Sequence, residues 1–330
     1  MLSFIRAYPT ETKLLSVLVL LCLALSLSSD SFLTLGNFAS LLNNYSVNVI
    51  WATGLLVVLI AGGIDISFAV GASVVQYLCV YAFVAIGGGN WAIGLVTAAL
   101  FGIGLGLINA FLIHQFRIIS IVVTISTFNV FFGLLMFFSS GRFLYNLPGW
   151  WSHRVALLQH QSADGTWAEI TLPVGVMIAA IVATLFLIRH TTTGRQLYAF
   201  CDNPEGARRA GINIALMQAI AFGWCGMMGG IGGLMQAQIV KQVVPNALIG
   251  RELDVLAAVV LGGARLGGGR GSVLGCFLGV MLVAITQNGL NLLGVSPYAF
   301  KMVVGVIILI AISMSNVDLA ELLKPKREGH

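Results

Sequence analysis

Apolar runs of membrane-spanning length recur from one end of this chain to the other. The chain is 58% hydrophobic and only 9% charged, whereas a soluble domain carries about 25% charged residues. A helix needs about 20 apolar residues to cross the hydrocarbon core of a bilayer. Because backbone polar groups must be paired inside the bilayer, such runs fold as helices. The sequence therefore predicts an all-α, polytopic membrane protein embedded in a lipid bilayer.

We predict about ten transmembrane helices, some of them short or broken, within a single transmembrane domain over residues 1–330. The predicted spans are 14–30, 40–62, 66–86, 91–113, 118–138, 171–189, 214–238, 252–264, 272–290 and 299–316. The eighth is too short to cross a bilayer alone and is expected to be half-inserted. With the N-terminus inside, most of the 17 Lys and Arg residues fall on the inner side, which predicts that both termini are cytoplasmic.

Composition and motifs also exclude several functions. The net charge of +5 is explained by basic cytoplasmic loops, so we predict no nucleic-acid binding. Glycines cluster inside apolar runs, where small residues let helices pack closely. The glycine-rich stretch GGARLGGGRGS (262–272) lacks the lysine of a phosphate-binding loop, and no histidine has metal-ligand spacing. We therefore predict no cofactor and no metal bound by this chain.

The longest external connection, residues 139–170, carries three tryptophans, Trp150, Trp151 and Trp167. Tryptophan is enriched where helices leave the membrane, so these residues are interpreted as an interfacial aromatic belt. The alternative is a docking surface for an external partner.

The longest inner connection, residues 189–214, contains a signal for a short helix in NPEGARRAG (203–211). Its asparagine is a favourable N-cap, its proline suits the first helical position, and its final glycine can end the helix in a left-handed conformation. A helix of about two turns is unstable alone in water, so a partner is expected to hold it. The small Gly206 and Ala207 are expected on its outward face. The residues of this segment are Asn203, Pro204, Glu205, Gly206, Ala207, Arg208, Arg209 and Gly211. The alternative is an ordinary basic loop.

The stretch AGGIDIS (61–67) places Asp65 between two apolar runs. An ionised group at membrane depth costs several kcal/mol unless it faces protein, water or a partner. One interpretation is that Asp65 caps the third span by accepting backbone N–H bonds. The other is that it lies in the transport pathway and binds a polar substrate or a proton.

Further polar residues are candidates for a gate or a pathway. Acidic side chains begin the eighth segment, where they either favour a helix start or line an outer vestibule. Neutral amides suit hydroxyl-rich substrates, because each offers a donor and an acceptor, but they can equally join helices. The candidates are Asp65, Ser67, Asn44, Asn48, Asn129, Glu252, Asp254 and Asn288.

Three motifs occur in a fixed order: GGIDIS, TTTGRQLYAFCDNPEGARRAGI and LDVLAAVVLGGARLGGGRGSVLG. Together they resemble the permease subunits of bacterial ABC importers for ribose, galactose, arabinose and autoinducer-2, within the branched-chain-type transport permease family. That family shows a GGIDLSVG-like stretch, T-x-x-G-R with A-A-R-x-x-G-I, and E-L-D-x-I-A-A-V-V before paired glycines. The resemblance extends over essentially the whole chain.

The resemblance implies a subunit of the bacterial inner membrane that has no catalytic residues and forms a pathway for a monosaccharide or a similar small polyhydroxylated solute. Implied partners are cytoplasmic ATP-binding subunits that hold ATP and Mg, a periplasmic substrate-binding protein, and a second permease copy or paralogue. The contact with the ATPase then falls on residues 203–211. The residues leave open an ion-coupled secondary transporter that uses Asp65 as a proton or sodium site.

Overall fold

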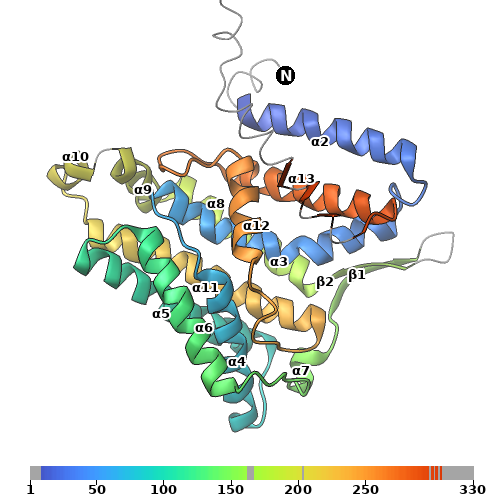
Figure 1. Cartoon of the computed structure of the whole chain (residues 1–330), viewed down its shortest axis with the longest axis horizontal. Coiled ribbons are helices and arrows are strands. Elements are labelled where there is room, and N and C mark those ends of the chain that lie inside the picture. The colour runs from blue at the N-terminus through green and yellow to red at the C-terminus, as the bar shows by residue number, and fades with distance from the viewer. Residues whose placement is uncertain are drawn as a thin grey trace, which may run out of the picture.

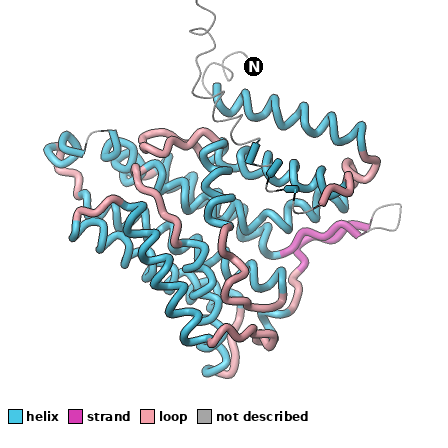
Figure 2. The backbone as a smooth tube through the Cα atoms, viewed as in Figure 1, coloured by secondary structure: helices cyan, strands magenta, loops and turns pink. Residues whose placement is uncertain are grey.

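The computed structural model describes residues 9–161, 167–202, 204–296 and 299–306, except 301 and 304. Helices make up most of it (Figures 1 and 2). The helices are α2 (Pro9–Ser28), α3 (Leu35–Ile60), α4 (Phe68–Ile86), α5 (Trp91–Phe116), α6 (Ser120–Ser139), α7 (Gly149–Ser152), α8 (Leu172–His190), α9 (Thr192–Asp202), α10 (Pro204–Arg209), α11 (Ile214–Val240), α12 (Arg251–Leu261) and α13 (Val273–Leu292). The strands are β1 (Ala156–Gln161) and β2 (Trp167–Thr171).

Eight of these helices are long and apolar enough to cross a membrane. They are α2, α3, α4, α5, α6, α8, α11 and α13, and they coincide with predicted spans one to seven and nine, with ends shifted by a few residues. The eighth predicted span is α12, whose 11 residues are too few to cross, because a helix rises about 1.5 Å per residue. The tenth predicted span lies mostly outside the described residues. The chain is thus a helical, polytopic membrane protein, as predicted.

Two helices, α3 and α11, form the centre of the molecule. Of the membrane-length segment of α3, 83% is buried, against 6% for α2 at the edge. Figure 1 shows α2 and α13 on one side of this centre and α4, α5 and α6 on the other. The central pair therefore joins the helices on its two sides into one fold.

The two helices α5 and α11 pack closely through stripes of small residues. A Cβ atom added to Gly102 would lie 2.1 Å from the backbone oxygen of Gly226, and one added to Gly230 would lie 2.2 Å from that of Ala98. Small residues at four-residue spacing let two helix backbones touch within a membrane. The interpretation of these intramembrane glycines as packing residues is confirmed here.

A second contact of the same kind holds the short helix α12 against α13. A Cβ atom on Gly275 would lie 2.1 Å from the backbone oxygen of Gly262, and one on Gly279 would lie 2.1 Å from that of Ala258. Because α12 cannot span the membrane, its place in the fold depends on this contact.

The external connection contains structure that the sequence did not predict, namely α7 and an antiparallel hairpin of β1 and β2. The belt interpretation is wrong for Trp151, which is fully buried and donates its indole N–H to the carbonyl oxygen of Leu234 at 3.0 Å. Trp150 packs edge-on against Phe83 at a ring-centroid distance of 5.0 Å. Trp167 is 59% exposed and remains compatible with an interfacial position. A buried N–H needs an acceptor, and α11 supplies it for Trp151.

Candidate functional site

Asp65 lies in the connection between α3 and α4, and only 2% of it is exposed. Its Oδ1 accepts two hydrogen bonds from Ser67, one from the backbone N–H at 2.8 Å and one from the hydroxyl at 2.7 Å. This is an Asx turn, in which an aspartate accepts from the residue two positions on. Gly62 turns the chain out of α3 with a φ of +78°, a conformation that glycine adopts without steric cost. Asp65 thereby orders the chain as it enters α4.

The hydrogen bonds of Asp65 continue into two helices. Asn109 of α5 donates to the hydroxyl of Ser67 at 2.7 Å, and its own Oδ1 accepts from Thr127 of α6 at 2.7 Å. One buried polar network therefore joins the connection to α5 and α6, and Cys225 of α11 lies near Asp65. The role of Thr127 could not be found from sequence, since it sits in an apolar run.

The backbone of the same connection is held by the start of α6. The N–H of Ile64 donates to the hydroxyl of Ser120 at 3.0 Å, and the hydroxyl of Thr124 donates to the carbonyl of Ile64 at 3.2 Å. A cavity of about 10 Å³ adjoins Asp65 and Asn109, which is about the space that one water molecule needs. The connection is thus closely packed and leaves no open channel beside Asp65.

The predicted short helix on the inner side is α10, which begins at Pro204. Asn203 and the side chain of Pro204 lie outside what the structure describes. Gly211 has a φ of +81°, and its N–H donates to the carbonyl of Arg208 at 3.1 Å. The helix therefore ends in the left-handed glycine conformation that the sequence predicted.

The outward face of α10 differs from the expectation. Ala207 is only 5% exposed and packs into the hydrophobic core, so it does not present a small outer surface. Gly206 is half-buried, whereas Arg208, Arg209 and Glu205 are exposed. The carboxylate of Glu205 pairs with Arg209 at 3.6 Å. A helix this short needs an apolar anchor, and Ala207 provides it, which leaves a charged surface outside.

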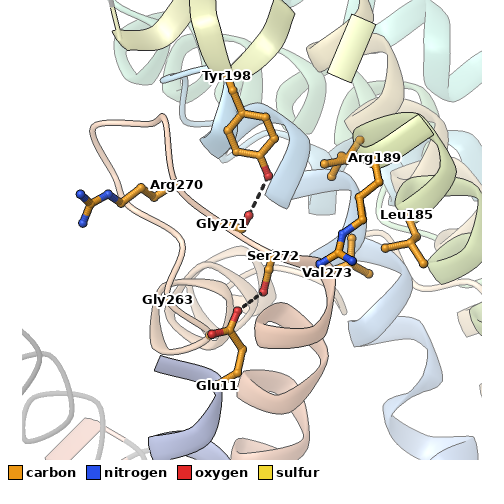
Figure 3. A pocket seen from close by; sticks show the side chains of 11 residues that line it. Glu11, Leu185, Arg189, Tyr198, Gly263, Arg270, Gly271, Ser272 and Val273 are labelled. Atoms are coloured by element: carbon orange, nitrogen blue, oxygen red, sulfur yellow. Dashed lines mark hydrogen bonds between the residues drawn. The ribbon is translucent and has the colours of Figure 1, made fainter. Parts of the chain in front are cut away.

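Helix α9, which precedes α10, was not predicted. Leu197 and Phe200 lie three residues apart on the buried face of α9. This amphipathic pattern is the sequence signal that could have predicted the helix. The hydroxyl of Tyr198 donates to the carbonyl of Gly271 at 2.7 Å (Figure 3). Burial raises the pKa of the Tyr198 hydroxyl, although the nearby charge of Arg189 opposes this shift, so the hydroxyl remains a donor at neutral pH.

Through these contacts α9 reaches two irregular connections at once. The thiol of Cys201 donates to the carbonyl of Gly267 at 3.1 Å, in the connection between α12 and α13. The N–H of Gly269 in that connection donates to the carbonyl of Ile60 at 3.1 Å, at the end of α3. A Cβ atom on Gly62 would lie 2.8 Å from Sγ of Cys201, and one on Gly268 would lie 2.6 Å from Cα of Gly62. The connections 61–67 and 262–272 therefore touch each other, and α9 contacts both.

The acidic pair at the start of α12 lies elsewhere. Both carboxylate oxygens of Glu252 accept from the N–H of Gly250 at 3.0 Å, and Glu252 is 6% exposed. Asp254 and Tyr45 lie close enough to Arg251 to interact with it electrostatically. Glu252 thus orders the helix start, whereas Asp254 belongs to a polar group between α12 and α3.

That polar group continues along α3. The hydroxyl of Tyr45 donates to Oε1 of Gln287 on α13 at 2.6 Å. Asn44 is exposed and Asn48 is half-buried, and helical spacing puts both on the side of α3 that carries Tyr45. The Oδ1 atom of Asn48 is buried and has no hydrogen-bond partner within the described part of the chain. We call Asn44, Tyr45, Asn48, Arg251, Asp254 and Gln287 the outer polar cluster.

Two predicted amides have structural contacts instead. Asn288 of α13 and Asn37 of α3 exchange hydrogen bonds at 2.9 and 3.1 Å. Asn129 is exposed and donates to the carbonyl of Ile125 in its own helix at 2.8 Å. The structure thus brings Asp65 and Ser67 together but separates them from the outer polar cluster by about 20 Å, the length of α3 between them. No group of three His, Cys, Asp or Glu residues that could hold a metal occurs in the described ranges.

Comparison with known proteins points to one family. The family described as the permease component of the branched-chain amino acid transport system matches residues 25–312. The ribose import permease RbsC of Escherichia coli K12 is 30% identical over 328 residues, which cover 95% of this chain and 96% of the relative. RbsC of Bacillus subtilis 168 is 31% identical over 299 residues, covering 91% and 90%.

A third relative has another named substrate. The autoinducer 2 import permease LsrC of Yersinia enterocolitica is 29% identical over 309 residues, which cover 93% of this chain and 82% of LsrC. No solved structure matches the chain.

Proposed function

The chain belongs to the family of permease components of the branched-chain amino acid transport system, and from this we propose that it is the pore-forming subunit of an ATP-driven importer. Its solute is a monosaccharide or a similar small polyhydroxylated molecule. Relatives of nearly the same length, named as ribose and autoinducer 2 import permeases, support this substrate class. The chain works in the bacterial inner membrane as a multi-pass protein.

Other subunits complete the transporter. Cytoplasmic ATP-binding subunits hold ATP and Mg and hydrolyse the nucleotide, and a periplasmic substrate-binding protein delivers the solute. A second copy of this chain, or a paralogue, forms the other half of the pathway. The contribution of this chain is to change shape when the ATPase subunits do.

The observation that carries the proposal is the position of α9 and α10. The exposed charges of α10 are available to an ATPase subunit, while Ala207 fixes the helix to the permease core. Behind α10, Tyr198 and Cys201 of α9 hold the connection 262–272 through its carbonyl oxygens. A displacement of α10 is thereby transmitted to α12, α13 and the end of α3.

The solute is accommodated at the outer polar cluster. Its amide, phenol and carboxylate groups offer both donors and acceptors to the hydroxyl groups of a solute. The unpartnered Oδ1 of Asn48 supports this assignment, because a buried carbonyl oxygen is stabilised by any donor that reaches it.

Asp65 acts as a structural joint at the opposite end of α3. Its carboxylate oxygen is occupied by both donors of Ser67, and the adjoining cavity has space for about one water molecule. Among the described residues, helix α4 has no side-chain cap, and Asp65 bonds to Ser67 at its N-cap position, so these contacts favour a structural turn before α4 over a proton or sodium site.

The energy source is the first test. Uptake of the solute into right-side-out membrane vesicles, loaded with ATP and supplied with the substrate-binding protein, is measured with and without an ionophore that dissipates proton and sodium gradients. We expect uptake to persist with the ionophore and to stop when ATP is withdrawn. Uptake that collapses with the ionophore at constant ATP would establish the ion-coupled alternative instead.

The second test identifies partners and solute together. The tagged chain is purified gently from native membranes, and the proteins that accompany it are identified. We expect a cytoplasmic ATPase in about equal amount and a periplasmic protein whose bound ligand is identified by mass spectrometry. A bound amino acid in place of a sugar would contradict the substrate class but not the importer.

A further inference from the structure

A cavity of about 480 Å³ opens on the side of the molecule that carries α9, at the ends of α8 and α13 (Figure 3). It is distinct from the outer polar cluster and from the Asp65 network, and the transport proposal does not use it. It is lined by Glu11, Leu185, Ile188, Arg189, Tyr198, Gly262, Gly263, Arg270, Gly271, Ser272 and Val273. Four separate parts of the chain therefore meet around it.

The charged groups of this cavity leave a single positive charge. Arg189, at the end of α8, directs its guanidinium group toward Ser272, and Arg270 lies on the other side of the opening with its side chain turned outward (Figure 3). Glu11 of α2 is the one carboxylate in the lining, and its Oε1 accepts the hydroxyl of Ser272 at 2.7 Å. The lining therefore complements a ligand with one negative charge.

Three apolar side chains of the lining belong to membrane-crossing helices. Leu185 and Ile188 lie on α8, and Val273 begins α13, both of which are long and apolar enough to cross the bilayer. A ligand with a charged end at Arg189 and apolar chains along these helices would contact both the basic and the apolar side chains. A small soluble anion would leave the apolar part without a partner.

We propose that this cavity binds the phosphodiester headgroup of an anionic phospholipid from the cytoplasmic leaflet, with its acyl chains lying along α8 and α13. A phosphodiester carries one negative charge, which matches the lining, and arginine forms paired hydrogen bonds with phosphate oxygens. Basic pockets between transmembrane helices on the cytoplasmic side commonly hold such headgroups. The proposal rests on the orientation that the proposed function requires, but not on the identity of the solute.

The site has a consequence for coupling. Its wall includes Tyr198 of α9 and Gly271, the two residues joined by the hydrogen bond behind α10. A bound lipid therefore contacts both α9 and the 262–272 connection where these two segments meet. It stabilises the arrangement in which α9 and this connection are in contact.

The test measures lipid retention, not transport. The purified chain is reconstituted in nanodiscs of phosphatidylcholine, with or without phosphatidylglycerol, and bound lipid is counted by native mass spectrometry after release into detergent. We expect retained phosphatidylglycerol to bind about fivefold more weakly in Arg189→Gln and about 30-fold more weakly in Arg189→Gln with Arg270→Gln, because each arginine near a charged headgroup contributes about 1 kcal/mol. Arg189→Lys, which keeps the charge, should retain most of the binding.

Arg195→Gln is the matched control, since Arg195 is an exposed arginine of α9 outside the lining. It should retain phosphatidylglycerol like the unmodified chain, and size-exclusion profiles verify that every variant is folded. Equal retention in the double variant, or equal loss in the control, would overturn the site. Complete displacement of the lipid by soluble glycerophosphoglycerol at comparable concentration would show a free phosphate-ester site instead and would also overturn the proposal.

Discussion

The two glycine-rich connections of this protein, 61–67 and 262–272, touch each other but are held in opposite ways. The first is fixed by side chains, because Asp65 is bonded to Ser67 and the network continues through Asn109 to Thr127. The second is held from outside through its carbonyl oxygens, at Gly267 and Gly271. One connection is therefore locked into the helices that surround it, and the other follows the helix that contacts it.

Backbone conformation deepens this contrast. The 61–67 connection has one residue with positive φ, Gly62, whereas 262–272 has four, at Gly263, Gly268, Gly269 and Gly271. Glycine without side-chain anchors has many accessible conformations. We infer that connection 61–67 is the fixed joint of the permease. Connection 262–272 is the movable joint, through which α9 moves α12 and α13.

The largest effect is expected from replacing Asp65, because the loss of its carboxylate would disrupt the fixed joint. In Asp65→Leu both donors of Ser67 lose their acceptor in a buried site, at about 1–3 kcal/mol for each. We expect less than a tenth of the normal assembled permease and no uptake. Asp65→Asn keeps an oxygen acceptor, and it should retain much more of both. Equal loss in Leu and Asn variants that both fold and assemble would mean that the charge itself is required, contrary to the role of Asp65 in a structural turn.

Gly268 tests the movable joint with a neighbouring control. A Cβ atom there would lie 2.0 Å from Sγ of Cys201 and 2.6 Å from Cα of Gly62, at a φ of +80°, so Gly268→Ala should push the 262–272 connection away from both α9 and the end of α3. The left-handed conformation alone costs about 1–2 kcal/mol for a residue with a side chain. Uptake per ATP hydrolysed should fall by about tenfold, while assembly with the ATPase persists.

Gly267→Ala is the control, since a Cβ atom at Gly267 meets nothing within 4 Å and its φ is not positive. Its uptake per ATP should be normal. If the two variants behave alike, contact between α9 and this connection does not transmit the movement.

Reversing the exposed charges of α10 tests whether an ATPase subunit binds this helix and thereby moves the movable joint. Arg208→Glu with Arg209→Glu reverses two exposed charges without touching the buried Ala207, so the permease should fold normally. Co-purification of the ATPase should fall by roughly fivefold to tenfold at low salt, because rim charges govern association more than stability. Arg195→Glu serves as the control for a charge change on α9. Normal ATPase binding in the double variant would remove α10 from the interface.

The smallest effect is expected from Tyr198→Phe, which removes one hydrogen bond to Gly271 and keeps the ring. A single hydrogen bond contributes about 0.5–1.5 kcal/mol, so uptake per ATP should decrease by about threefold. The measurement is the ratio of uptake to ATP hydrolysis in proteoliposomes. A decrease in protein stability with an unchanged ratio would assign Tyr198 a purely structural role.

Many helix positions and helix ends of this molecule are determined by local stretches of its sequence. The membrane-crossing helices followed from apolar length, which the bilayer thickness makes decisive. The left-handed end of α10 at Gly211 followed from a glycine after two arginines, and the shortness of α12 followed from the predicted segment 252–264, which is too short to cross a bilayer. Each of these depends on a few adjacent residues, so no tertiary information was needed.

What only the tertiary structure decided are the contacts between residues far apart in the chain. Sequence placed Trp151 at the membrane interface, whereas packing buried it against Leu234. Sequence could propose a capping role for Asp65 but could not show that Asn109 and Thr127 complete its network. Nor could it show that Tyr198 would bond to Gly271, because no local sequence pattern links these two residues. Such contacts form when helices pack against one another. Within a membrane, which helices pack together depends on how well their surfaces fit, because the surfaces are similarly apolar.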